Sequence, residues 1–257
     1  MSTTGRATAG AGRGAVRGAG AVVTGGGSGI GAATVEVLAR HGAHVLVVDR
    51  DRDAGRAVAA RTGQSFVAAD VGVPADWQLV RAAADDLGNV RYVHLNAGVN
   101  SGPQWSPLAE LADDRLFGTL AVNLAGVVLG VRALAPLMEH RAGSVLVTAS
   151  LAALGPFPAD PVYAATKAGV IGFVRSVAGQ LDRQGIRINV LCPTATDTPM
   201  VGEADREWLS RSGVPLADVT TMAEAMVACL TGPGTGQVFR CDGDAGPQLV
   251  PVPQMGD

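Results

Sequence analysis

Short runs of consecutive apolar residues recur along the chain, and most of them end at a polar residue. Seven such runs lie at 21–23, 44–48, 66–69, 92–95, 145–148, 188–191 and 237–240. Stretches with helical character separate them, at 32–40, 53–61, 75–87, 114–141, 161–183 and 221–230. Strands that helices cover on both faces need continuous rather than alternating apolar runs. The pattern therefore predicts an α/β fold, with a doubly wound parallel sheet of about seven strands and helices on both faces.

The alternation continues without a linker or an internal repeat, which indicates one domain over 19–257. The preceding segment, 1–18, is rich in Gly, Ala, Thr and Arg and lacks the apolar region of a signal peptide, so we expect a flexible tail. The most membrane-like segment, 120–138, contains an asparagine and an arginine, so we predict a buried core helix and no membrane partner.

The composition argues against several classes of partner. The 257 residues are 47% hydrophobic and 17% charged, with a net charge of −3, which is typical of a compact globular protein and not of a nucleic-acid-binding one. The three cysteines are far apart and form no CxxC pair, so we predict no disulfide framework and a cytoplasmic location. His41 and His44 have no further ligand nearby, and no metal site is predicted.

Distinctive polar residues stand where the predicted strands end. They are Thr24, Asp49, Asp70, Asn96 and Ser150. In open α/β sheets, ligands bind in the crevice outside the carboxyl ends of the strands. We therefore expect these five side chains to surround one binding site.

The first strand leads into a glycine-rich turn, Thr24–Gly31, and a helix follows it. Glycines permit a close approach of the backbone to a pyrophosphate, and the helix presents free N–H groups and the positive end of its dipole. Such a turn also serves ordinary loops, but its place between a strand and a helix indicates a Rossmann-type dinucleotide site. The cofactor-binding candidates of this turn are Gly25, Gly27, Ser28, Gly29, Ile30 and Gly31.

Asp49 ends the second predicted strand and can accept hydrogen bonds from both hydroxyls of an adenosine ribose. Its charge would repel a 2′-phosphate, which favours NAD over NADP as the cofactor. Arg50 and Arg52 follow directly and offer partners to a phosphate, so an NADPH-dependent enzyme stays open as an alternative. Asp49 can also be an ordinary turn or helix-capping residue.

Tyr163 and Lys167 are four residues apart in a YxxxK pattern, so on a helix they share one face. Lys167 is the only lysine of the chain, and its ammonium is expected to lower the pKa of Tyr163 from about 10. Such a tyrosine can exchange a proton with an alcohol or a ketone. Each residue can also have a purely structural role, Tyr163 as a half-buried aromatic residue and Lys167 as a surface charge. Similarly, Ser150 can be a loop hydroxyl and Asn123 a buried polar residue.

Taken together, these motifs resemble those of the short-chain dehydrogenases/reductases. The glycine spacing of Thr24–Gly31 is similar to the TGxxxGIG fingerprint of that family. Asp70–Val71 resembles its adenine-contacting pair, and Asn96–Gly98 its NAG motif. The segment 147–150, followed by the YxxxK pattern, resembles the catalytic segment, and 192–200 resembles the family's PGxVxTxM segment. The resemblance covers most of the chain.

The resemblance implies a role for each member of the catalytic group. Tyr163 would be the general acid/base, Lys167 would lower its pKa and bind the nicotinamide ribose, and Ser150 would hold the substrate oxygen. Asn123 would position a water that relays protons. The remaining cofactor-binding candidates are Arg50, Asp70, Val71, Asn96, Ala97, Gly98, Tyr163, Lys167, Pro193, Thr196 and Thr198. In the last segment, threonines at 194 and 196 replace the family's glycine and valine, which affects the pocket beside the nicotinamide.

The sequence therefore predicts an oxidoreductase that transfers hydride between NAD(H) and a small-molecule secondary alcohol or ketone. The residues expected around the substrate, among them Leu151, Phe157, Met200 and Trp208, favour a largely apolar substrate, although they also suit ordinary packing. The family implies a homotetramer or a homodimer, and a short lid over the substrate at about 200–214. The alternatives are an NADPH-dependent ketone reductase of the 3-oxoacyl type, a non-catalytic NAD-binding regulatory protein, and a lyase or epimerase on the same fold.

Overall fold

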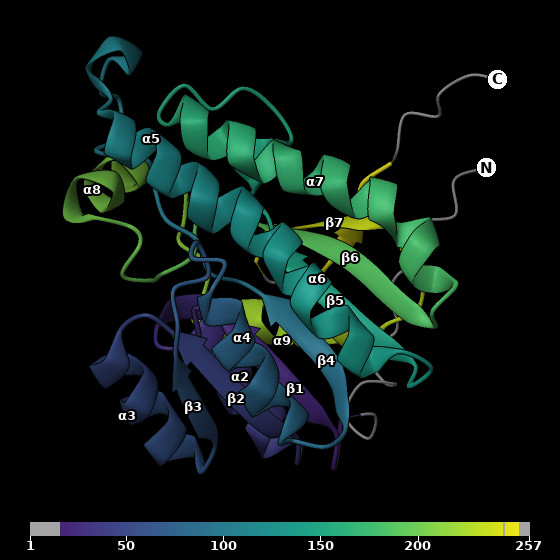
Figure 1. Ribbon diagram of the computed structural model, residues 1–257. Coiled ribbons are helices and arrows are strands. Elements are labelled where there is room, and N and C mark those ends of the chain that lie inside the picture. The colour runs from purple at the N-terminus through teal and green to yellow at the C-terminus, as the bar shows by residue number, and fades with distance from the viewer. Residues whose placement is uncertain (1–15, 244, 252–257) are drawn as a thin grey trace, which may run out of the picture.

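A mostly parallel sheet forms the centre of the protein (Figure 1). The computed structural model describes residues 16–243 and 245–251, and within them the sheet has eight strands in the order β3-β2-β1-β4-β5-β6-β7-β8. The strands are β1 (Gly20–Thr24), β2 (His44–Asp49), β3 (Ser65–Ala68), β4 (Val90–Leu95), β5 (Gly143–Thr148), β6 (Ile186–Pro193), β7 (Val238–Cys241) and β8 (Gln248–Leu249). The parallel strands β1 to β7 confirm the seven predicted ones. The short β8 pairs antiparallel to β7 and had no signal in the apolar pattern.

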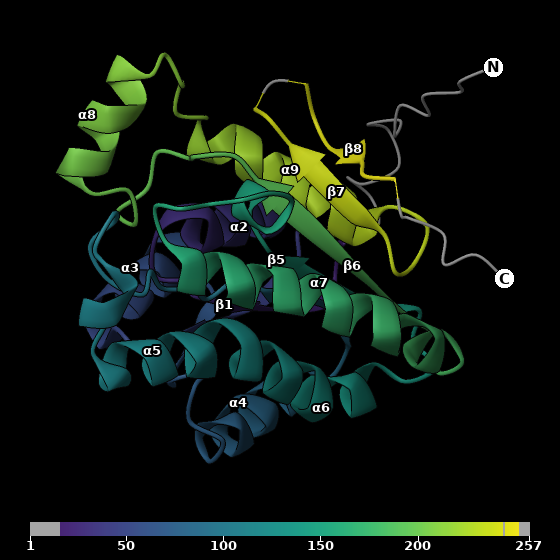
Figure 2. The same ribbon diagram turned by 90° about the horizontal axis from the view of Figure 1, so that it is seen from above.

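Helices cover both faces of the sheet, as Figure 2 shows from above. One face carries α4 (Asp76–Asp85), α6 (Gly126–Met138) and α7 (Pro161–Asp182), and the other carries α2 (Gly29–Arg40), α3 (Arg52–Thr62) and α9 (Val219–Thr231). Each face has its own buried apolar core. Every residue of β1 and of β5 is buried, which explains why these strands read as continuous apolar runs.

The order in which strands are added to the sheet reverses at β1. β2 and β3 extend on one side of β1, and β4, β5 and β6 extend on the other. A crevice forms outside the carboxyl ends of the strands at such a switch point. Because β1 ends at Thr24 and β4 at Leu95, the glycine-rich turn and Asn96 come together there.

The segment predicted as one helix, 114–141, is three consecutive pieces. α5 (Asp113–Leu120) continues into α6 through a π-helical turn, Ala121–Ala125. Such turns occur mostly as single insertions in α-helices and are frequent at functional sites. By length and composition, Asp113–Met138 is the one helix of the described chain that could cross a membrane. One face of α6 is nevertheless buried against α4, β4 and β5, which is the arrangement predicted for a core helix.

Three short elements and the chain start complete the fold. The predicted lid contains α8 (Glu203–Arg211), a helix that the apolar pattern did not indicate. Two 3₁₀ turns, η1 (Leu108–Glu110) and η3 (Leu151–Ala153), follow β4 and β5. The predicted tail lies outside the described residues except for 16–18, which form a turn with Val16 fully buried.

Candidate active site

A cavity of about 640 Å³ lies at the carboxyl ends of the strands. It extends from Asp49 at the end of β2, past the glycine-rich turn, to Tyr163 on α7. Residues from both halves of the sheet meet there, as the positions of their strand ends predicted. The predicted site residues all line this cavity, except Thr24, Gly27, Gly31 and Asn123.

The turn after β1 is built from glycines because side chains would not fit. Gly25 has a φ of 63° and Gly29 a φ of 51°, in the left-handed region that favours glycine. A Cβ atom on Gly31 would lie 2.0 Å from the carbonyl oxygen of Gly25, so Gly31 closes the turn instead of lining the cavity. α2 begins at Gly29 without a side-chain cap, and Ser28 and Ile30 line the cavity beside it. The N-terminus of α2 is therefore available to an anion.

Backbone N–H groups hold the carboxylate of Asp49 at the rim of the cavity. Oδ2 accepts a hydrogen bond from the N–H of Gly27 (2.8 Å), and Oδ1 accepts one from the N–H of Asp51 (2.9 Å). A Cβ atom on Gly27 would lie 2.8 Å from Oδ2, so glycine allows this approach. Gly27 therefore supports Asp49 and does not itself line the cavity. Each carboxylate oxygen keeps a lone pair for a further donor.

Asp70 and Val71 line the cavity beyond the end of β3. The carboxylate of Asp70 accepts a hydrogen bond from the N–H of Gly72 (2.8 Å), and its own N–H donates to Asp76 (2.8 Å). Arg50 is exposed next to Asp49 and also lines the cavity. The adenosine end therefore carries more negative than positive side chains.

This arrangement fits a dinucleotide. The carboxylate of Asp49 stands where a ribose needs acceptors, and the uncapped N-terminus of α2 stands where a pyrophosphate needs donors. The glycine turn is a cradle that a Cβ atom would fill. The far end of the cavity, at Ser150, Tyr163 and Lys167, is left for the nicotinamide and the substrate.

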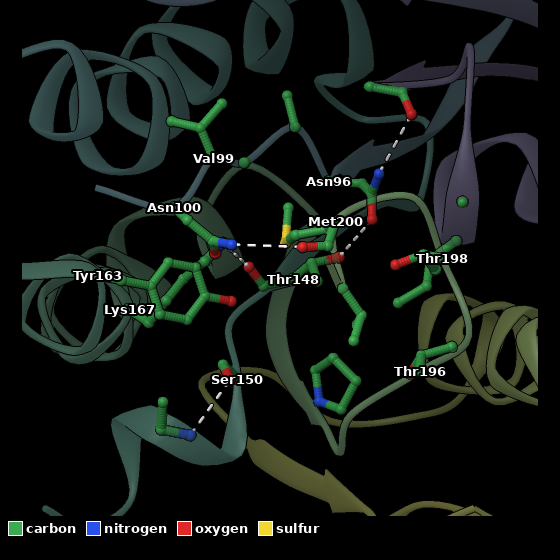
Figure 3. Close-up of a pocket in the computed structure, with 18 of the residues that line it drawn as sticks. Asn96, Val99, Asn100, Thr148, Ser150, Tyr163, Lys167, Thr196, Thr198 and Met200 are labelled. Atoms are coloured by element: carbon green, nitrogen blue, oxygen red, sulfur yellow. Dashed lines mark hydrogen bonds between the residues drawn. The ribbon is translucent and has the colours of Figure 1, made fainter. Parts of the chain in front are cut away.

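Asn96 ties the glycine-rich turn to strand β5. Its Nδ2 atom donates to the carbonyl oxygens of Thr24 (3.2 Å) and Gly25 (3.4 Å), and its Oδ1 accepts from the hydroxyl of Thr148 (3.1 Å) (Figure 3). The hydroxyl of Thr24 accepts in turn from the N–H groups of Asn96 (3.0 Å) and Ala97 (3.2 Å). Asn96 thus holds the glycine-rich turn against strand β5.

Lys167 is almost completely buried at the other end of the cavity, with 3% of its surface exposed. Its Nζ atom donates to the carbonyl oxygen of Thr148 (2.9 Å) and lies 5.6 Å from the centre of the Tyr163 ring. Burial lowers the pKa of Lys167 to about 8. A Cβ atom on Gly98 would lie 3.2 Å from Nζ, so the glycine of the Asn96–Gly98 motif makes room for the ammonium group.

Tyr163 and Ser150 face one another across this end of the cavity (Figure 3). The hydroxyl of Ser150 accepts a hydrogen bond from the N–H of Ala152 (3.2 Å), which fixes its position. Burial raises the pKa of Tyr163 to about 12, and the hydrogen bond with Ser150 offsets part of that rise. The YxxxK spacing predicted a lowered pKa. In the free protein the pKa shifts the other way, because the cost of burying the phenolate outweighs the hydrogen bond with Ser150.

Asn123 lies in the π-helical turn and is fully buried. Its Oδ1 accepts from the N–H of Val99 (2.8 Å), and its Nδ2 donates to the carbonyl oxygen of Val99 (2.9 Å) and to the hydroxyl of Thr166 (3.1 Å). Both amide hydrogens are therefore used in joining the loop after β4 to α7. It stands behind Lys167 and does not open on the cavity.

Asp160 is a site residue that the sequence analysis missed. Its carboxylate caps α7 by accepting from the N–H of Tyr163 (2.9 Å), and it also accepts from the hydroxyl (2.6 Å) and the N–H (2.9 Å) of Ser101. It thereby joins the loop after β4 to the first turn of the catalytic helix. An aspartate directly before Pro161, at the first helical position, is a known helix-start signal and could have identified it.

The loop after β6 closes the opposite side of the cavity, where Thr196 and Thr198 lie (Figure 3). Pro193 is the last residue of β6, and the hydroxyl of Thr196 donates to the carbonyl oxygen of Thr194 (2.9 Å). Arg206 of α8 donates to the carbonyl oxygen of Thr198 (3.0 Å). Helix α8 is thus attached to the loop that faces the glycine-rich turn, a contact that no sequence motif indicated.

Comparison with known proteins connects this geometry to a family. A family model described as short chain dehydrogenase matches residues 19–208. The chain belongs to the short-chain dehydrogenase/reductase family. It is therefore an oxidoreductase that acts on an alcohol or a ketone with a nicotinamide cofactor.

Several relatives of known name are similar over most of their length. The chain is 38% identical over 211 residues to a probable galactose dehydrogenase of Rhizobium meliloti (strain 1021), which covers 77% of this chain and 78% of the relative. It is 34% identical over 209 residues to the NAD(+) 15-hydroxyprostaglandin dehydrogenase of Mus musculus, covering 75% of this chain and 72% of the relative. The substrates in these names differ widely, so the family does not fix the substrate.

Solved structures of the family agree with the fold and differ in the cofactor. A 3-ketoacyl-(acyl-carrier-protein) reductase of Brucella melitensis, complexed with NADH, has a TM-score of 0.81 at 30% identity and covers 90% of this chain and 99% of its own. A short chain dehydrogenase of Burkholderia cenocepacia J2315, in complex with NADP, has a TM-score of 0.80 at 29% identity, with 90% and 98% covered. The choice between NAD and NADP must therefore come from this chain's own residues.

Proposed function

We propose that the protein is an NAD-dependent oxidoreductase that interconverts a largely apolar secondary alcohol and its ketone. The observation that carries this proposal is the convergence of Ser150, Tyr163 and Lys167 at one end of the cavity whose other end holds Asp49. A non-catalytic NAD-binding protein would not need these three side chains in one place. The same argument weighs against a lyase or epimerase.

Tyr163 is the proton carrier of the proposed reaction. In ketone reduction its hydroxyl donates a proton to the developing alkoxide, and in alcohol oxidation its phenolate accepts the hydroxyl proton. The hydroxyl of Ser150 donates a hydrogen bond to the substrate oxygen as charge develops on it. The nicotinamide, when bound, supplies or accepts the hydride. Because the pKa of Tyr163 in the free protein is about 12, the protonated form needed for reduction dominates at neutral pH.

Lys167 favours the ionised form of Tyr163 and carries a charge that depends on pH. Its pKa of about 8 means that the ammonium form prevails below that pH and weakens above it. We infer that it also binds the nicotinamide ribose, since Nζ lies at the cavity with a single protein acceptor. Asn123 fixes the loop and helix behind this ammonium group, where a water could relay protons to solvent.

Asp49 supports NAD as the cofactor. Two N–H groups hold its carboxylate at the rim. If the carboxylate moved away from an incoming ribose, it would lose these hydrogen bonds. A 2′-phosphate there would meet Asp49 together with Asp51, against the single charge of Arg50. Thr198, Thr196 and Pro193 line the cavity where the carboxamide of the nicotinamide would lie.

The preference for an apolar substrate is supported by the side chains beyond Ser150 and Tyr163. The expected residues Leu151, Phe157, Met200 and Trp208 line this part of the cavity, together with Asn100, Ala152 and Thr194. The ring of Trp208 contacts that of Trp105, with 6.0 Å between the centroids, so two exposed aromatic residues meet at the mouth. Aromatic and aliphatic surfaces of this kind favour apolar ligands.

We also propose that the protein assembles into a homotetramer or homodimer. Phe117 of α5 and Val128 of α6 are exposed on the helix layer that covers one face of the sheet. Light scattering after size exclusion tests this: a monomer at micromolar concentration would contradict it.

The first test is a fluorescence titration of the purified protein with NADH and with NADPH. We expect tighter binding of NADH, followed by turnover of apolar secondary alcohols with NAD as measured by absorbance of the reduced cofactor. Tighter NADPH binding would overturn the cofactor assignment and favour the NADPH-dependent ketone reductase. Binding without turnover of any alcohol or ketone in a broad panel would favour the regulatory protein.

A further inference from the structure

A buried histidine lies beside the site and has no role in the chemistry proposed above. His94 belongs to β4, its side chain is fully buried, and its Nε2 atom lies 2.8 Å from the hydroxyl oxygen of Thr148. Its Nδ1 atom is buried without a hydrogen-bond partner in the part of the chain that the structure describes. An apolar residue would avoid this unpaired nitrogen. The contact with Thr148 is therefore what a histidine adds at this position.

The backbone around Asn96 determines the direction of each hydrogen bond. The carbonyl oxygens of Thr24 and Gly25 only accept, so the Asn96 atom that faces them is the amide nitrogen. Its Oδ1 must then accept the single proton of the Thr148 hydroxyl. That hydroxyl has no second proton, so His94 donates to it through Nε2–H. Burial lowers the pKa of His94 to about 3, which keeps the ring neutral and agrees with one N–H.

We propose that His94 is a positioning residue that locks the Thr148 side chain in the rotamer from which it orients Asn96 and the glycine-rich turn. The chain of donors runs from His94 to Thr148, from Thr148 to Asn96, and from Asn96 to the carbonyl oxygens of Thr24 and Gly25. Successive hydrogen bonds of this kind polarise one another in a dry environment. The inference rests on the proposed function only in that the glycine-rich turn binds the cofactor.

The same geometry indicates which kinetic step the network serves. The carbonyl oxygen that binds Lys167 belongs to the backbone of Thr148, and the strand pairing of β5 with β6 holds that backbone in place. Loss of the His94 donor frees the Thr148 side chain without moving its carbonyl group. We therefore expect weaker cofactor binding and a nearly unchanged rate at saturating cofactor.

Two polar substitutions separate this role from a merely structural one. The amide nitrogen of glutamine can occupy the place of the histidine Nε2 atom, whereas the shorter side chain of asparagine ends near the place of Nδ1. His94→Gln therefore keeps a donor for Thr148, and His94→Asn removes it while staying polar. Thr148→Val keeps the side-chain shape and removes the hydroxyl, so it breaks the same network without touching His94.

The test uses two readouts on the full-length protein. Amide hydrogen exchange without any cofactor reports on the glycine-rich turn, and we expect faster exchange over 24–29 in His94→Asn and Thr148→Val than in the wild type and His94→Gln. NADH titration should show about fivefold to tenfold weaker binding in the same two variants, the effect of about one lost hydrogen bond. At saturating NAD, kcat should stay within about twofold of the wild type, because only the cofactor turn is released.

The proposal is overturned if His94→Asn has the hydrogen-exchange rates and the NADH affinity of the wild type. It is also overturned if His94→Gln, at equal thermal stability, shows the same faster exchange and weaker NADH binding as His94→Asn. If His94→Asn folds poorly, Thr148→Val decides, and its wild-type behaviour would equally contradict the proposal. If the wild type binds neither NADH nor NADPH, the proposed function fails, and the exchange experiment still tests the network.

Discussion

The two ends of the cavity hold their polar groups in different ways. At the adenosine end, Asp49 lies partly exposed at the rim, and two backbone N–H groups fix its carboxylate. At the catalytic end, Lys167, Asn123 and His94 are almost completely buried, and hydrogen bonds to backbone or side-chain groups hold each of them. One end is partly exposed and carries a fixed negative charge, whereas the other is buried and depends on a connected network.

The two ends differ in how much their charged groups cost in folding stability. A charge at a hydrated rim costs little, and its replacement changes selectivity with small effects on folding. A buried ammonium group is costly, and the lowered pKa of Lys167 reflects that cost directly. Single substitutions at the rim should therefore change cofactor preference, whereas substitutions in the buried group should change activity or stability.

The largest effect is expected at Tyr163. Tyr163→Phe removes the proton carrier and keeps the ring, so kcat should fall by about 10²–10⁴-fold, the usual contribution of a general acid/base. The affinity for NADH should change little, because the substitution leaves the glycine-rich turn and Asp49 untouched. Steady-state kinetics together with NADH titration checks both parts.

Ser150→Ala serves as the matched comparison for this substitution. It keeps the phenol and removes the hydrogen bond that lowers the pKa of Tyr163, so the loss of activity should be smaller than in Tyr163→Phe and the pH needed for oxidation should rise. Equal activity of Tyr163→Phe and the wild type would rule out Tyr163 as the proton carrier.

Lys167→Met should damage activity and yet stabilise the fold. Burial lowers the pKa of Lys167 from 10.5 to about 8, so the folded protein binds this proton less readily than the unfolded chain does. The cost is fully present below pH 8 and disappears as the pH rises through 10.5. Below pH 8 we expect a gain of about 1–3 kcal/mol in the free energy of unfolding, which shrinks toward pH 10. Denaturant unfolding of both proteins at three pH values measures it.

The lysine itself can be observed directly, because it is the only one in the chain. Selective ¹³Cε-lysine labelling gives a single side-chain resonance, and its titration should have a midpoint near pH 8. A midpoint near the ordinary value of 10.5, or a Lys167→Met variant that is less stable at every pH, would show that the catalytic end is wetter than the structure indicates.

Sequence reasoning captured the features that depend on neighbouring residues. The seven main strands followed from apolar runs, and the pairing of Tyr163 with Lys167 followed from their spacing on one helix. The convergence of Asp49, Asn96 and Ser150 followed from the rule that strand ends meet at one edge. These are local patterns, or consequences of sheet topology.

The features that could not be predicted from the sequence depend on how deeply a side chain is buried, or on contacts between segments far apart in the chain. The YxxxK pattern gives the proximity of Tyr163 and Lys167, but it does not report burial, and burial decides the direction of the Tyr163 pKa shift. The π-helical turn at Ala121–Ala125 has no apolar signature, because it keeps the helical pattern on both sides. His94 and Thr148 meet only because β4 pairs with β5.

Asp49→Asn should change cofactor preference by an intermediate amount. It keeps a side chain of the same shape at the rim and removes the negative charge, so a 2′-phosphate is no longer repelled. We expect the ratio of NADPH to NADH affinity to rise about tenfold or more, in line with charged hydrogen bonds worth about 1.5–3 kcal/mol. Asp53→Asn is the control, since Asp53 is exposed in the first turn of α3 and lies outside the cavity lining. An equal shift in both variants would mean that only overall charge matters.

The smallest effect is expected when Asp49 itself is retained and only the position of its carboxylate changes. In Gly27→Ala, the new Cβ atom would lie 2.8 Å from Oδ2 of Asp49, so the carboxylate must leave the N–H group that orients it. NADH affinity should fall about threefold to fivefold, the effect of roughly one net hydrogen bond. The preference for NADH over NADPH should remain, because the charge remains. Gly179→Ala, at a helical position with open space around it, should leave NADH affinity unchanged. If Gly27→Ala instead reverses the preference, orientation rather than charge selects the cofactor at this end of the cavity.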